Sequence, residues 1–142
     1  MVKNPPDRTQ RIIPYLAYDD VATSVEFLAT AFGLETRLVH RDKDGVIRHA
    51  EAGLGDAVVM MGPASPQWGT ASPHALPALH CSILVYVDDV NAHFRHARAA
   101  GATIDSEPED KPYGDRMYGA RDREGNQWWF ATHVRDVNLD EL

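Results

Sequence analysis

Histidine has the widest chemical range of the side chains in this chain, which contains seven histidines in 142 residues. His49 and Glu51 stand two residues apart in a predicted strand, so their side chains share one face of that strand. Imidazole and carboxylate groups are ligands for divalent metal ions. Together with His80, they form the one improvised metal site that the sequence offers.

His80 has a second possible role, because Ser82 follows it by two residues and shares its face of a predicted strand. A neutral imidazole both donates and accepts hydrogen bonds, and it titrates near neutral pH. His80 and Ser82 could therefore orient a ligand in a cavity. Alternatively, His80 is a structural histidine at the rim of the fold, and the sequence leaves both roles open.

Aromatic residues form the other group that could bind a ligand. Their rings stack on planar molecules, and their faces attract cations. Five of them lie on strands or loops expected to face or border a cavity: Tyr15, Trp68, Tyr113, Tyr118 and Trp129. Alternation along a strand points Trp128 and Phe130 away from Trp129. Core packing is the alternative for about half of the set. The predicted ligand-binding residues are Tyr15, Trp68, His80, Ser82, Tyr113 and Trp129.

Composition limits the classes of partner. The net charge of −7 argues against nucleic acid, because phosphate contacts need clustered basic residues. We expect no membrane association, since no apolar run reaches the ~18–20 residues that a membrane span needs. The single cysteine, Cys81, excludes a disulfide scaffold and fits a reducing, cytoplasmic location. We expect its thiol to be buried and inert.

An internal repeat organises the chain. Residues 12–18 and 79–87 are apolar, strand-like runs, and Asp-Asp-Val follows each of them at an offset of 69 residues. Asp19 or Asp20 can cap the helix that begins there in the first half, and Asp89 can cap the helix of the second half. Gly33 is placed to end the first helix in the left-handed conformation.

Each half therefore predicts strand, helix and three further strands. The hairpin turns are marked by Asp-Gly and Gly-x-Gly-Asp sequences, which supply positive φ angles. The linker between the halves carries four prolines and is too proline-rich to be a helix. The predicted boundaries are a disordered arm (1–10), the first module (11–61), the linker (62–78), the second module (79–134) and a C-terminal tail (135–142).

Residues 113–134, read as YGDRMYGARDREGNQWWFATHV, resemble the last hairpin of the vicinal oxygen chelate superfamily. That superfamily includes glyoxalase I, extradiol dioxygenases and bleomycin-resistance proteins. The resemblance covers residues 11–134 and is nearest to the PhnB-like, glyoxalase-like branch, which Val-Asp-Asp-Val at 87–90 also fits. It implies an α+β fold of two βαβββ modules forming a half-open eight-stranded barrel around a cavity. It also implies a homodimer, because such modules often pair between chains.

The metal-binding positions of that superfamily are occupied by poor ligands in this chain. The resemblance places them at Ile13, at Val59 or Met60, at Ser82 and at Trp129. Divalent ions prefer imidazole, carboxylate or thiolate ligands. The resemblance therefore implies the fold without its usual metal chemistry.

Taken together, these features predict a protein of the bleomycin-resistance type that binds a small molecule without a metal ion or other cofactor. The expected ligand is an aromatic or cationic natural product, such as an antibiotic, which would be bound without being turned over. The alternative is an enzyme, a glyoxalase-type lyase or isomerase or a dioxygenase, with a rearranged metal site at His49, Glu51 and His80.

Overall fold

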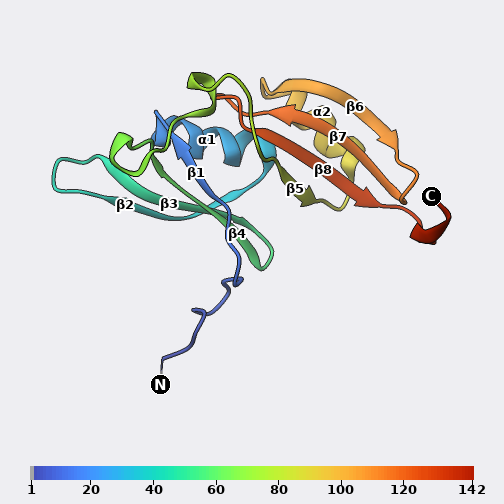
Figure 1. The fold of residues 1–142 in the computed structure, drawn as a ribbon, viewed down its shortest axis with the longest axis horizontal. Coiled ribbons are helices and arrows are strands. Elements are labelled where there is room, and N and C mark those ends of the chain that lie inside the picture. The colour runs from blue at the N-terminus through green and yellow to red at the C-terminus, as the bar shows by residue number, and fades with distance from the viewer. Residues whose placement is uncertain (1) are drawn as a thin grey trace. The chain divides into compact units, whose positions relative to one another are not determined.

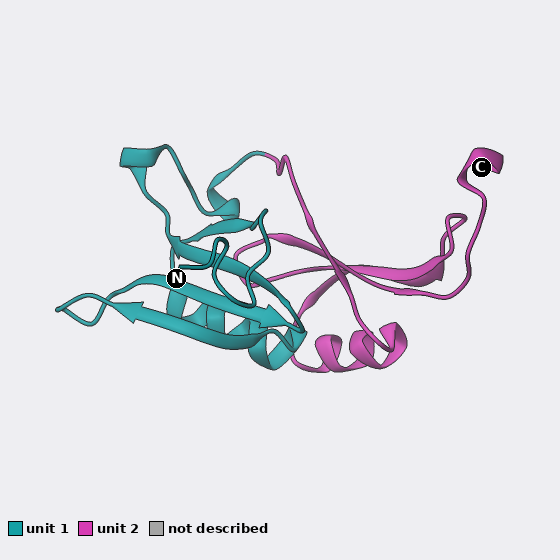
Figure 2. Cartoon of the chain, turned by 90° about the horizontal axis from the view of Figure 1, so that it is seen from below, with its two compact units in different colours: residues 1–77 teal, residues 78–142 magenta. Residues whose placement is uncertain are grey.

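The computed structural model describes residues 2–142, so Met1, the first residue of the predicted arm, lies outside the described residues. The chain divides into two compact units, residues 1–77 and residues 78–142, coloured teal and magenta in Figure 2. Within the described residues, each unit contains one α-helix and one four-stranded sheet (Figure 1).

The first unit runs strand, helix and three strands. Its elements are β1 (Tyr15–Tyr18), α1 (Val21–Phe32), β2 (Glu35–Arg41), β3 (Ile47–Leu54) and β4 (Ala57–Pro63). The sheet has the order β1-β4-β3-β2, with β1 parallel to β4 and the other pairs antiparallel. Two short 3-10 helices follow β4, η1 (Pro66–Trp68) and η2 (Pro73–Ala75).

The second unit repeats this order. Its elements are β5 (Ile83–Tyr86), α2 (Val90–Ala99), β6 (Thr103–Asp110), β7 (Asp115–Arg121), β8 (Gln127–His133) and the 3-10 helix η3 (Leu139–Glu141). The sheet order is β5-β8-β7-β6, with β5 parallel to β8. The predicted pair of βαβββ modules is confirmed, while the closing of the two sheets into one barrel stays a prediction. Among the described residues, no helix has the length and apolar content needed to cross a lipid bilayer.

Aspartate caps begin both α-helices, as the sequence predicts. The Asp20 carboxylate accepts a hydrogen bond from the Thr23 amide at 3.0 Å, and Asp89 does the same for Ala92 at 3.0 Å. Each cap satisfies an amide that has no partner within the helix. Gly33 ends α1 with a φ of 74°, in the left-handed region that a Cβ disfavours.

The helix of each unit covers one face of that unit's sheet. α1 packs against β2, β3 and β4, and α2 packs against β6, β7 and β8. The fully buried aromatic and large apolar side chains are Tyr18, Leu28, Phe32, Met61, Tyr118, Trp128 and Phe130. Because strand side chains alternate, the residues between these core positions point to the opposite face, which we call the open face of each sheet.

The expectation that Tyr118 faces or borders a cavity is wrong, because Tyr118 is fully buried in the core. It pairs directly with Phe130 across β7 and β8, so the two side chains share the face that α2 covers. Its hydroxyl is hydrogen-bonded to Nδ1 of His93 at 2.6 Å, and its ring stacks on that of Phe130. This burial raises the pKa of Tyr118.

Both predicted first strands begin later than expected. β1 starts at Tyr15, directly after Pro14, which has no amide hydrogen for a sheet ladder. β5 starts at Ile83, which pairs with Trp128 of β8. The pairing of β5 with β8 begins at Ile83, so His80 and Ser82 are not on a strand. Cys81 lies in the same segment and is exposed, so the expectation of a buried thiol is wrong.

Candidate functional site

The open face of the first sheet carries a row of side chains from all four strands. Tyr15 lies opposite Met60, Met60 opposite Glu51, and Glu51 opposite Leu38. Directly opposite residues share a face. Of the two candidate positions on β4, the register therefore places Met60 on the open face, while Val59 is buried.

Three polar side chains on this face form a hydrogen-bonded chain, which we call the Glu51–His49–Tyr15 chain. Nε2 of His49 lies 2.8 Å from Oε2 of Glu51, and Nδ1 of His49 lies 2.9 Å from the Tyr15 hydroxyl oxygen. Burial and the nearby Glu51 carboxylate raise the pKa of Tyr15. Both ring nitrogens of His49 are thus engaged, which leaves neither available to a metal ion without breaking a hydrogen bond.

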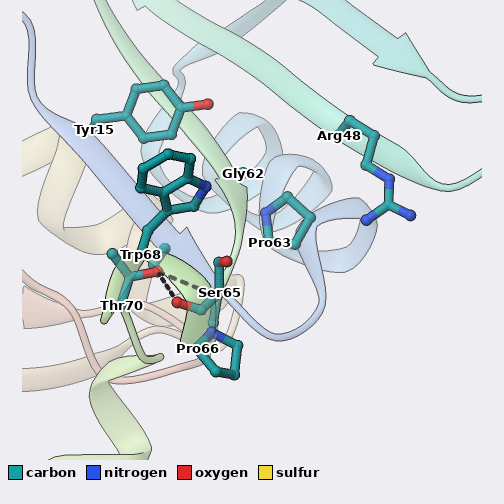
Figure 3. A pocket seen from close by; sticks show the side chains of 10 residues that line it. Tyr15, Arg48, Gly62, Pro63, Ser65, Pro66, Trp68 and Thr70 are labelled. Atoms are coloured by element: carbon teal, nitrogen blue, oxygen red, sulfur yellow. Dashed lines mark hydrogen bonds between the residues drawn. The ribbon is translucent and has the colours of Figure 1, made fainter.

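A pocket of about 550 Å³ lies beside this chain, and Tyr15 and Trp68 both line it (Figure 3). We call it the Tyr15–Trp68 pocket. Gly62 and Pro63 at the end of β4 form part of its wall, and Arg48 of β3 is its charged lining residue. Trp68 is 77% exposed, so its indole is available to a ligand. The structure thus brings together two of the predicted ligand-binding residues.

A tight turn holds Trp68 at this pocket. The Ser65 carbonyl accepts hydrogen bonds from the amides of Trp68 and Thr70, and the Ser65 amide donates to the Thr70 hydroxyl at 2.9 Å. Gly69 closes the turn with a φ of 71°. The segment predicted as a proline-rich linker therefore contains an ordered turn that positions an exposed indole.

A second pocket of about 380 Å³ lies in the second unit, and we call it the Trp129 pocket. Ser82, Tyr113 and Trp129 line it, so three more of the predicted residues come together there. The indole of Trp129 lies against Gly119, where a Cβ would be 2.8 Å from the ring. The Tyr113 hydroxyl donates to the sulfur of Met117 at 2.9 Å.

His80 does not line the Trp129 pocket, although Ser82 does. It is exposed and lies in the second unit, whereas His49 and Glu51 lie in the first. Within the first unit, His49 and Glu51 bond to each other, and His49 also bonds to Tyr15. The predicted set is therefore not assembled within one unit.

The residues at the superfamily's metal positions do not fit a divalent ion. Ile13, Met60 and Trp129 offer no imidazole, carboxylate or thiolate, and Ser82 offers only a hydroxyl. These four positions therefore do not support chemistry that depends on a metal ion.

Sequence reasoning missed the basic residue at each pocket. Arg48 borders the Tyr15–Trp68 pocket, and its Nε donates to Asp42 at 2.9 Å. Lys111 borders the Trp129 pocket and forms an ion pair with Glu109. A strand or loop lysine or arginine is ordinarily a solvated surface residue, so the sequence carries no signal that separates these two from the others.

A buried carboxylate anchors the end of β8 to the start of β7. Asp115 accepts hydrogen bonds from the Tyr86 hydroxyl and from Nδ1 of His133, both at 2.8 Å, while Nε2 of His133 bonds to Asp136. Burial opposes ionisation of Asp115, but the bonds from His133 and Tyr86 hold its pKa below the usual value. Asp136 and Asp115 raise the pKa of His133.

Comparisons with known proteins agree with the fold. Residues 8–130 match the family model of the Glyoxalase/Bleomycin resistance protein/Dioxygenase superfamily. An uncharacterized protein of Mycobacterium bovis, Mb0911c, is 33% identical over 132 residues, which are 91% of this chain and 87% of the relative. The crystal structure of TioX from Micromonospora sp. ML1 is 32% identical, with a TM-score of 0.70, and the match covers 91% of this chain and all of TioX.

A more distant structure is TnmS3, described as an antibiotic binding protein from Streptomyces sp. CB03234. It is 16% identical with a TM-score of 0.66, and the match covers 90% of this chain and 95% of TnmS3. At that identity the likeness concerns the fold alone. The fold of this chain is therefore one that also occurs in a binding protein.

Proposed function

The chain belongs to the glyoxalase/bleomycin resistance protein/dioxygenase superfamily, and we propose that it is a metal-independent member that binds a small aromatic natural product. An antibiotic is the ligand class we favour, because TnmS3, which has the same fold, is an antibiotic binding protein. Sequestration of a drug and transport within a biosynthetic pathway are both compatible with binding without turnover. Membership of the PhnB-like branch stays a prediction.

The observation that carries this proposal is the exposed indole of Trp68 beside Tyr15 at a pocket of about 550 Å³. Leaving an indole exposed forgoes the free energy that its burial would provide. A planar ligand lying against Trp68 would recover that free energy. Ligand sites commonly combine such apolar faces with a few polar groups that set orientation.

The charges at the two pockets favour a neutral or anionic aromatic ligand over a cationic one. Arg48 borders the first pocket and Lys111 borders the second. Each basic group raises the electrostatic cost of bringing a cation close to it, and its partner carboxylate, Asp42 or Glu109, offsets part of this effect. Although the net charge of −7 attracts cations at long range, the local groups decide affinity within a pocket.

The assembly and location are part of the same proposal. We expect a homodimer, because modules of this superfamily often pair between chains, and a cytoplasmic protein, because the one cysteine is unpaired. Neither a nucleic acid nor a membrane is an expected partner. Light scattering of the purified protein tests the dimer, and a monomer at micromolar concentration would contradict it.

Binding is tested with 8-anilino-1-naphthalenesulfonate, an anionic aromatic dye whose fluorescence rises in apolar sites. We expect a Trp68→Ala variant to bind the dye about eight- to thirtyfold more weakly, because roughly 50–80 Å² of apolar contact is lost at ~25 cal/mol per Å². Leu76→Ala is the matched control, because Leu76 is exposed on the same segment but does not line the pocket. Equal affinities of Trp68→Ala and the parent would refute a ligand site at Trp68.

Metal independence needs a separate measurement. We expect elemental analysis of the purified protein to find less than one divalent ion per ten chains. A stoichiometric ion that is lost in His49→Ala would favour the enzyme alternative and would overturn metal independence.

A further inference from the structure

The direction of the hydrogen bonds in the Glu51–His49–Tyr15 chain follows from which groups can donate. A carboxylate only accepts, so the His49 Nε2 that lies 2.8 Å from Glu51 must carry the proton. A neutral imidazole has a single N–H, so Nδ1 of His49 is then an acceptor. With the imidazole in this neutral form, the hydroxyl of Tyr15, 2.9 Å from that nitrogen, donates to it. Glu51 therefore sets the tautomer of His49.

This polarity leaves the Tyr15 oxygen as an acceptor. A phenolic hydroxyl has one proton and can accept hydrogen bonds through its oxygen. Since the proton is directed to His49, the oxygen is left to accept a bond from another molecule. Burial and the Glu51 carboxylate raise the pKa of Tyr15, which keeps the group a neutral phenol.

The Tyr15 oxygen lies at the wall of the pocket. A Cβ added at Gly62, which lines the same pocket, would be 3.1 Å from this oxygen. The hydroxyl thus lies over a residue with no side chain, and Tyr15 is 59% exposed. Figure 3 shows Tyr15 and Trp68 together at one part of the pocket, with Arg48 at another.

We propose that the Glu51–His49–Tyr15 chain makes this pocket selective for aromatic molecules that donate a hydrogen bond, such as phenols or aromatic amines. The inference rests on the proposed binding function and specifies the ligand class of the same pocket. The ring of the ligand lies against Trp68, and its O–H or N–H donates to the Tyr15 oxygen. Glu51 and His49 are positioning residues, because they act only through Tyr15.

The test compares two probes that differ in a single hydrogen-bond donor, 6-hydroxy-2-naphthoate and 6-methoxy-2-naphthoate. Both carry a carboxylate that complements Arg48, and isothermal titration calorimetry measures the affinity of each. The Tyr15→Phe variant gives the baseline ratio of the two affinities, which corrects for the size and hydrophobicity of the methyl group. We expect the wild-type ratio to favour the hydroxy probe about three- to tenfold more than this baseline does, as one hydrogen bond would.

A second variant tests the role of Glu51 in the Glu51–His49–Tyr15 chain. In Glu51→Gln the side-chain amide both donates and accepts, so it no longer sets the tautomer of His49. We expect both probes still to bind and the affinity ratio to fall toward that of Tyr15→Phe. A merely structural role for Glu51 would change both affinities together and leave the ratio unchanged. Leu76→Ala is the control that keeps the wild-type ratio.

Each result has one meaning. A ratio that is equal in the wild type and Tyr15→Phe overturns the inference but leaves the proposed function standing, because the probes still bind. An affinity ratio that Glu51→Gln leaves unchanged overturns the role of Glu51 and His49 as positioning residues. Failure of both probes to bind the wild type overturns the proposed function and this inference together. Thermal denaturation shows whether each variant is folded. If either Tyr15→Phe or Glu51→Gln fails to fold, the affinity ratio of the other variant against the wild type still tests the proposal.

Discussion

Replacing Gly119 with alanine tests how the structure positions Trp129. The added Cβ would lie 2.8 Å from Cζ3 of the Trp129 indole and 3.1 Å from the hydroxyl oxygen of Ser106. Carbon atoms in contact are ordinarily about 3.5–4.0 Å apart, so the ring must move by roughly 0.7–1.2 Å. Overpacking of this kind costs about 1–3 kcal/mol, and the reduced freedom of the unfolded chain returns about 0.4–1 kcal/mol. We expect a net destabilisation of about 1–2 kcal/mol.

Urea unfolding followed by tryptophan fluorescence measures this change. The chain has three tryptophans, and a Trp68→Phe background leaves Trp128 and Trp129, both of which lie in the second unit. At a slope of about 2 kcal/mol per molar urea, the midpoint should fall by about 0.5–1 M. In a Trp129→Ala background the same Gly119→Ala change should cost much less, because the clashing ring is gone. A midpoint that does not move, or an equal cost in both backgrounds, refutes the reasoning.

Two further predictions concern helix capping and pH. Asp89→Ala should lower the free energy of unfolding by about 1 kcal/mol, because the Ala92 amide loses its partner, whereas Asp88→Ala should have little effect in the same urea assay. His133→Gln should destabilise the protein most between about pH 4 and 6.5, where imidazolium and the Asp115 carboxylate are both charged. The difference in stability between the variant and the wild type should decrease as the pH rises through the raised pKa of His133 and as the pH falls through the lowered pKa of Asp115. Urea midpoints measured from pH 3 to 9 test this, and a difference that stays constant over that range would contradict it.

Local signals made the modules predictable from sequence. Asp20 and Asp89 mark helix starts because a carboxylate satisfies free amides within three residues, which needs no tertiary contact. Gly33 marks a helix end because only its own backbone conformation is at issue. The alternation of Trp128, Trp129 and Phe130 also follows from strand geometry, and burial agrees with it.

Expectations that depended on long-range pairing were less reliable. Tyr118 was expected at a cavity, but its register against Phe130 placed it under α2. Cys81 was expected to be buried on a strand, but the pairing of Ile83 with Trp128 begins the strand two residues later. Register is set by the partner strand, and a single sequence does not state which residue of the partner lies opposite.

By itself, the sequence of this protein determines two βαβββ modules and the caps of their helices, because those features depend on residue type and on spacing along one segment. The resemblance to the superfamily adds that its metal-binding positions carry poor ligands. Only the tertiary structure decides that Tyr15 meets His49, 34 residues away, and that Trp68 reaches the pocket beside Tyr15. Hydrogen-bond polarity and pocket lining arise where distant segments meet in space, so they depend on the folded arrangement of the strands and not on local sequence.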